Sequence, residues 1–175
     1  MTNTAAETIT GERADLLESL AKHRQFLRFP ARDLSDEQAR TRTTVSELTI
    51  GGLIKHVTSV EETWARFIVD GAAAHPDATD PAVWETHAAG FRMGPDETLA
   101  GLLASHAEVA ARTDELVRTL PDLDAGHPLP EAPWFEPGAR WSARRVLLHI
   151  IAETAQHAGH ADIVREAIDG AKSMG

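Results

Sequence analysis

The sequence predicts an all-α protein, a four-helix bundle with two long crossover connections. Apolar residues recur at three- and four-residue spacing in four segments, and no segment alternates convincingly between apolar and polar residues as a half-buried strand does. The composition, 42% hydrophobic and 25% charged, is typical of a globular protein, and only 5% of residues are aromatic, so the core must be mainly aliphatic. A length of 175 residues suits one domain, and we expect residues 1–175 to form a single bundle.

The first predicted helix covers about residues 11–29. Its leucines and phenylalanines recur at helical spacing, and Pro30 ends it because proline breaks the helical hydrogen-bond pattern. Residues 34–38 then predict a short helical turn with Ser35 as its N-terminal cap.

The second predicted helix starts near Ser46 or Thr49 and reaches Asp70. Gly71 is well placed to cap its C-terminus, because glycine readily takes the backbone conformation that ends a helix. A crossover rich in glycine and proline follows, and residues 82–89 within it favour a short helix.

The third predicted helix opens at residues 94–97, where a proline precedes two acidic residues, and it runs to Leu120. A second irregular connection over residues 121–139 carries five prolines. The fourth helix is predicted over residues 142–168. Four helices with two long connections indicate a bundle that is not a set of tight hairpins.

The charge of the chain excludes some partners. The formal net charge is -10, and the longest basic cluster is the pair Arg144-Arg145, so we expect neither nucleic acid nor an anionic membrane as a partner. The chain has no cysteine, which rules out disulfides and thiolate metal sites of its own. Residues 1–10 carry no apolar signal core and no stretch is long enough to span a membrane, so we expect a cytoplasmic protein.

The fourth predicted helix places ionisable side chains on its core-facing line. At about 100° per residue, six residues share this line: Val146, Ile150, Glu153, His157, His160 and Val164. The line is apolar at both ends, yet a carboxylate and two imidazoles occupy its middle. Burying such groups is costly unless they are paired or bind a metal ion.

Glu153 and His157 are four residues apart, a spacing that lets two side chains of one helix bind the same ion. A third ligand must come from another helix, and His56 lies in the middle of the second one. Two imidazoles and one carboxylate suit Zn²⁺ or Ni²⁺ and leave coordination positions open. Two simpler interpretations stay open: His56 as a hydrogen-bonded core histidine, and Glu153 with His157 as a helix-stabilising pair.

Two stretches resemble a known family. Residues 51–57 (Gly-Gly-Leu-Ile-Lys-His-Val), followed by Val60, Glu61 and Trp64, resemble the second helix of the DinB/YfiT-like superfamily of helical metalloproteins. Residues 141–162, from Trp141 to Asp162, resemble its last helix. The likeness extends over nearly the whole chain in order and spacing, although only these two stretches are specific.

The resemblance implies a four-helix bundle whose metal is held by one histidine of the second helix and two residues four apart in the last. Many members have histidine at both later positions, whereas this chain has Glu153 at the first, as in the mycothiol-dependent maleylpyruvate isomerase branch. The usual Arg-Gly-Gln after the last ligand is replaced by Ala-Gly-His, which ends at His160. His160 is therefore a fourth ligand, a proton shuttle or an outer-shell group, and we take it as the candidate catalytic residue. His149 is the rival ligand, since it also lies four residues from Glu153.

The resemblance further implies thiol chemistry, in which a low-molecular-weight thiol such as mycothiol or bacillithiol attacks a small electrophile. Trp64, Arg144 and Arg145 are the candidate substrate-binding residues, with Trp84 and Trp134 beside them; surface charge and core packing are the alternative explanation. The remaining histidines are interpreted as surface residues: His23, His75, His87, His106 and His127.

Two other functions remain open. In the first, a metal-activated water hydrolyses a small substrate, with His160 or Glu61 as general base. In the second, the bundle is a non-catalytic metal-binding stress protein. The family likeness also implies a homodimer.

Overall fold

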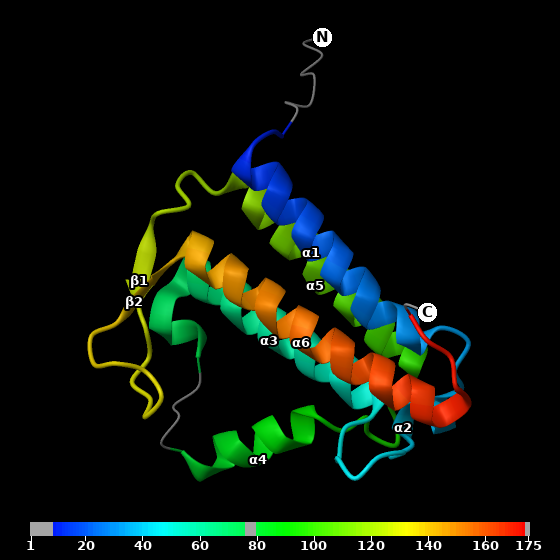
Figure 1. Ribbon diagram of the computed structural model, residues 1–175. Helices are drawn as coiled ribbons and strands as arrows, with labels where there is room; N and C mark the ends of the chain where they lie inside the picture. Colours follow the sequence, from blue (N-terminus) through cyan, green and yellow to red (C-terminus); the bar gives the residue numbers. More distant parts are fainter. Residues whose placement is uncertain (1–8, 76–79, 174–175) are drawn as a thin grey trace.

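A computed structural model describes residues 9–75 and 80–173 (Figure 1). Within these ranges the regular elements are α1 (Glu12–Arg28), α2 (Asp36–Arg40), α3 (Ile50–Asp70), α4 (Pro81–Gly90), α5 (Leu99–Thr119), β1 (Gly126–Pro128), β2 (Arg140–Ser142) and α6 (Ala143–Asp169). Helix dominates, as predicted. None of the helices in this described part has the length and apolar character needed to cross a membrane.

The helices α1, α3, α5 and α6 form the predicted four-helix bundle. The helix α6 packs between α1 and α3, and α5 packs on the other side of both. Figure 1 shows α1 and α6 running in one direction, with α3 and α5 running in the opposite one. Because α3 and α5 are parallel, the chain between them must return along the whole bundle, and α4 lies on this return path. The predicted first crossover is confirmed, and the second predicted connection is also long, although it joins α5 to α6, which run in opposite directions (Figure 1).

The capping residues explain where most helices begin and end. Ser35 caps α2 in a reciprocal capping box, and the Thr49 hydroxyl accepts a hydrogen bond from Gly52 N–H at the start of α3. Gly71 and Gly170 end α3 and α6 at φ values of 63° and 78°, which favour glycine. Ser35 and Gly71 are the predicted caps, Thr49 is one of the two predicted starts of α3, and Gly170 follows the predicted end of the fourth helix by two residues.

The start of the third bundle helix was predicted wrongly. The helix α5 begins at Leu99, not at residues 94–97, because the Thr98 hydroxyl caps it by accepting from Gly101 N–H at 3.1 Å. The acidic residue of the preceding segment, Glu97, accepts from the Gly94 N–H and pairs with Lys55 at 2.9 Å. It therefore anchors a turn on α3 instead of starting a helix.

The two strands were not predicted. They pair antiparallel with His127 opposite Trp141, and each has three residues. Three residues are too few to show a two-residue alternation above a proline-rich background. The pair brings the end of the second connection back to the start of α6.

A buried ion network ties the helices together between two apolar clusters. The Arg24 guanidinium of α1 donates to both carboxylate oxygens of Glu61 on α3, at 3.1 and 2.6 Å, and to Asp114 on α5 at 2.7 Å. Arg24 and Glu61 are almost fully buried. The idea of Glu61 as a general base is therefore wrong, because Arg24 occupies its carboxylate.

His106 also lies in the interior, contrary to the prediction of a surface residue. Its side chain on α5 is fully buried, and neither ring nitrogen has a hydrogen-bond partner among the described residues. Burial, together with the nearby cations of Arg28 and Arg24, lowers the pKa of His106 to about 4. His106 is therefore neutral in the folded protein.

His106→Leu is expected to stabilise the protein, and more so in acid. The ordinary pKa is 6.5, so at pH 5 the unfolded chain protonates this residue while the folded chain does not. That difference costs the wild type about 2 kcal/mol at pH 5 and nothing at pH 8. Urea unfolding of both proteins at the two pH values, with His23→Gln as control, measures it. An equal effect at both pH values would contradict a neutral, unpartnered His106.

Candidate metal centre

Three side chains from two helices converge at the contact between α3 and α6. Donor atoms of His56, Glu153 and His157 all lie within 4.8 Å of one another. Among the described residues, these three are the one group of possible ligands placed closely enough to hold a metal ion. The two histidines are buried and Glu153 is half-buried. His157 Nε2 lies 3.6 Å from Glu153 Oε2, as the four-residue spacing on α6 predicts. The ring centroids of His56 and His157 are 4.8 Å apart.

The protonation states suit a metal ligand set. Burial lowers the pKa of His56 to about 4; neighbouring His157 and His87 act in the same direction, and Glu153 opposes them. The adjacent His157 imidazole lowers the pKa of Glu153, against a smaller opposing effect of burial. At neutral pH His56 is neutral and Glu153 is ionised, which are the forms that bind a cation.

The ring of Phe91 covers His56. The two rings are stacked, with centroids 3.7 Å apart and planes 20° apart. This contact depends on Gly52, because a Cβ there would lie 2.7 Å from the Phe91 carbonyl carbon and closer still to its oxygen. The glycine pair at the start of α3 therefore lets the crossover backbone approach the helix.

His160 contacts His157 on the side away from Glu153. Its Nδ1 lies 3.3 Å from His157 Nδ1, so an N–H of one ring donates to the other. With Nδ1 engaged in this way, His157 directs Nε2 toward Glu153. The arrangement resembles the outer hydrogen bonds that fix the orientation of metal-binding histidines.

The rival ligand His149 lies among aromatic rings one turn earlier on α6. Its ring is edge-on to Trp64 at 4.8 Å and to Trp141 at 5.1 Å. Arg145 lies 4.1 Å over the Trp141 ring, so it borders the same group. Of the predicted substrate-binding residues, the structure therefore brings Trp64 and Arg145 together.

Arg144 points elsewhere. Its guanidinium donates to the carboxylates of Glu12, at the start of α1, and Asp124, in the second connection. The structure does not bring it to Trp64 and Arg145. Of the two other tryptophans, Trp84 and Trp134 contact each other with centroids 5.5 Å apart and remain about half exposed.

His87 and Phe91 were not predicted as site residues. His87 is exposed on α4, as expected, but its ring lies 5.7 Å from that of His56. Both residues come from the crossover, whose path has no signal in local periodicity. The sequence signal for them was the pair Gly51-Gly52, about one turn before His56, since adjacent glycines in a helix indicate a close backbone approach.

The family model described as mycothiol-S-transferase matches residues 15–170. The chain belongs to this family. The match includes His56, Glu153 and His157, which we call the triad, and it agrees with the resemblance in the second and last bundle helices. Comparison with curated proteins finds no significant match.

Solved structures of similar fold extend over almost the whole chain. A conserved protein from Enterococcus faecalis aligns with a TM-score of 0.65 at 14% identity, over 93% of this chain and 100% of that one. YfiT from Bacillus subtilis, described as a probable metal-dependent hydrolase with an unusual four-helix bundle topology, aligns with a TM-score of 0.64 at 17% identity, over 92% and 90% of the two chains. At these identities the likeness supports the fold.

The donor set fits a divalent cation. Two imidazoles and one carboxylate, gathered from two helices, are ligands that first-row metals accept, and three ligands leave positions for water or substrate. The outer contact from His160 is of the kind found around such ions. The triad is therefore a candidate divalent-metal centre.

Gly52→Ala is expected to destabilise the protein and weaken its metal affinity, because the new methyl group displaces Phe91 from His56. Forced overpacking of this kind costs about 2 kcal/mol. Gly159→Ala is the matched control, since its Cβ would meet nothing within 4 Å on α6; it should stabilise by about 0.5–1 kcal/mol. Urea unfolding and zinc titration test both variants. Unchanged stability and affinity in Gly52→Ala would contradict the close approach.

Proposed function

We propose that the protein is a metal-dependent thiol transferase, which joins a low-molecular-weight thiol of the mycothiol or bacillithiol type to a small electrophile. The observation that carries the proposal is the convergence of His56, Glu153 and His157 in a chain of the mycothiol-S-transferase family. Zn²⁺ and Ni²⁺ are the proposed metals, because histidine and carboxylate ligands suit both.

The residues of the chain have separate roles in this proposal. His56, Glu153 and His157 hold the cation; when bound, it lowers the pKa of a coordinating thiol and so supplies a thiolate at neutral pH. His160 positions His157 through the 3.3 Å contact between their Nδ1 atoms. Phe91 excludes water from one face of His56. The chain has no cysteine, so the sulfur comes from the thiol substrate.

Trp64 and Arg145 are proposed to contact the substrate. Trp64 contacts the ring of His149, which lies one turn before Glu153 on α6, and Arg145 lies over Trp141, which contacts the same histidine. We also retain the expectations of a homodimer, of a cytoplasmic location and of no nucleic-acid or membrane partner as part of the proposal.

Metal content tests the first step. Tag-free protein should contain about one zinc or nickel ion per chain, and His56→Ala or Glu153→Ala should lower metal affinity at least about tenfold. His149→Ala should keep the metal, because its ring is not part of the triad. Elemental mass spectrometry after reconstitution measures all four proteins. Metal retained in His56→Ala and lost in His149→Ala would contradict the ligand assignment.

Dependence on thiol tests the reaction. Consumption of a small chromogenic electrophile should require both the metal and an added thiol, and it should disappear in His56→Ala. The alternative of a metal-dependent hydrolase is favoured by the description of YfiT, whose fold this chain shares. Hydrolysis of ester or amide substrates without thiol would support that alternative and contradict the transferase.

A further inference from the structure

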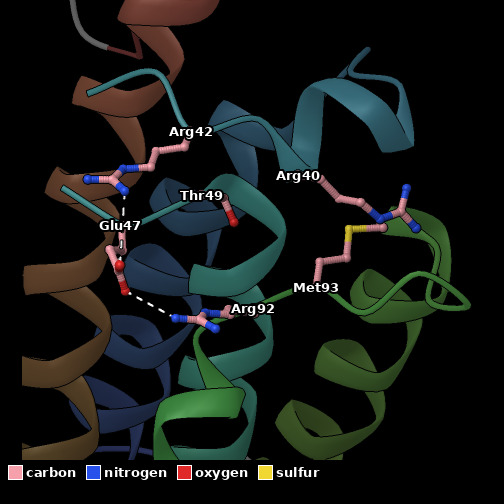
Figure 2. Close-up of a pocket in the computed structure, with 6 residues that line it drawn as sticks. All are labelled: Arg40, Arg42, Glu47, Thr49, Arg92 and Met93. Carbon is pink, nitrogen blue, oxygen red and sulfur yellow. Dashed lines mark hydrogen bonds and ion pairs between the residues drawn. The ribbon is translucent and has the colours of Figure 1, made fainter. Parts of the chain in front are cut away.

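A polar pocket separate from the metal centre lies at the start of α3, at the end of the bundle where α2 ends. Its volume is about 340 Å³, within the usual range for small-ligand sites. Six residues line it: Arg40, Arg42, Glu47, Thr49, Arg92 and Met93 (Figure 2). Nothing in the proposed thiol reaction uses these residues.

The charge of this lining is opposite to that of the protein. Three arginines and one carboxylate line the pocket, whereas the whole chain has a formal net charge of -10. The arginines come from separate segments: the end of α2, the loop before α3 and the crossover after α4. Arg40 and Arg42 are two residues apart, so folding gathers the group by bringing Arg92 of the crossover beside them.

Glu47 lies between two of these cations. Its carboxylate is 3.3 Å from the Arg92 guanidinium and 4.0 Å from that of Arg42 (Figure 2). Arg42 also donates to the carbonyls of Val45 and Ser46, which hold its side chain in place. A guanidinium has five N–H donors, so Arg92, which contacts this one carboxylate, keeps donors for another anion.

Arg40 has a different role. Its guanidinium donates to the carbonyl oxygens of Gly94, Pro95 and Glu97, so it fixes the chain that carries Arg92 and Met93. The Thr49 hydroxyl is already engaged by Gly52 N–H. Figure 2 shows the Arg40 guanidinium turned away from Glu47, whereas Arg42 and Arg92 both pair with Glu47, so these two are the charged groups left to bind an anion.

We propose that this pocket binds the carboxylate or phosphate group of a small molecule, with Arg42 and Arg92 as the binding residues. Planar guanidinium groups suit both anions. Glu47 occupies these cations in the absence of the ligand and competes with it.

The pocket is connected to the metal centre by one short segment. Phe91, stacked on His56, directly precedes Arg92. Thr49 is seven residues before His56 on α3, a distance of about 10 Å along the helix. The anionic group therefore belongs either to a free small anion or to the far end of a ligand that reaches the triad.

Isothermal titration of the full-length protein with inorganic phosphate tests the pocket without requiring thiol or turnover, so its failure would leave the proposed function untouched. Arg92→Gln should weaken binding about fivefold, and Glu47→Gln should strengthen it about fivefold because the competing carboxylate is gone. Arg112→Gln removes another exposed arginine, one that pairs with Glu62 outside the pocket, and it should leave binding unchanged. Each variant keeps the metal triad, so any phosphate that binds at the metal contributes equally to the titration of every variant.

No phosphate binding in the wild type, or equal losses in Arg92→Gln and Arg112→Gln, would overturn the proposal. Weaker binding in Glu47→Gln would also overturn it, because Glu47 would then support the pocket without competing. A mercaptoalkanoic acid with thiol and carboxylate about 10 Å apart distinguishes the two sources. If this acid binds in an Arg92-dependent way and more tightly when zinc is present, the pocket holds the far end of a ligand that reaches the triad. If its Arg92-dependent binding is the same with and without zinc, the pocket holds a free anion.

Discussion

The close approach of the first crossover to α3 determines much of the arrangement around the metal centre and around the proposed anion pocket. Because Gly52 has no side chain, the carbonyl of Phe91 lies directly against the helix, and Gly51 likewise makes room for Met93. This contact seats the Phe91 ring on His56 and buries Met93 in the core. Arg92 lies between them and reaches the proposed anion pocket. One backbone contact therefore positions the cover of the metal centre and a cation of the proposed anion site.

The ionisable side chains of the interior are found in three different charge and pairing states. Arg24 and Glu61 neutralise each other in a hydrogen-bonded pair that links three helices with the help of Asp114. His106 has no partner among the described residues and stays neutral because burial lowers its pKa to about 4. In the triad, a neutral His56 and an ionised Glu153 are gathered with room for a cation. A pair such as Arg24–Glu61 needs no further ligand, whereas the triad has only one carboxylate and offers open donor atoms.

Periodicity and capping predicted the bundle helices well, because an apolar stripe and a capping residue act within one helix. The triad was also predictable, since polar residues on the core-facing line of α6 require an explanation wherever that line packs. Interactions between distant segments were not. Glu97 looked like part of a helix start but binds Lys55 on α3; Glu61 looked available but is held by Arg24. His106 looked like a surface residue, and His87 approaches His56 only because of the path of the crossover.

The proposed function requires a cation held by nitrogen and oxygen ligands, with coordination positions left for a thiol. X-ray absorption at the zinc edge, measured on the reconstituted protein before and after addition of mycothiol or bacillithiol, tests this most directly. We expect a first shell of nitrogen and oxygen with two imidazoles, and a sulfur neighbour at about 2.3 Å once the thiol is added. A shell without imidazole, or one with imidazole that is the same in His56→Ala, would contradict the metal centre. An intact imidazole shell that never gains sulfur would contradict the thiol chemistry and leave the metal site standing.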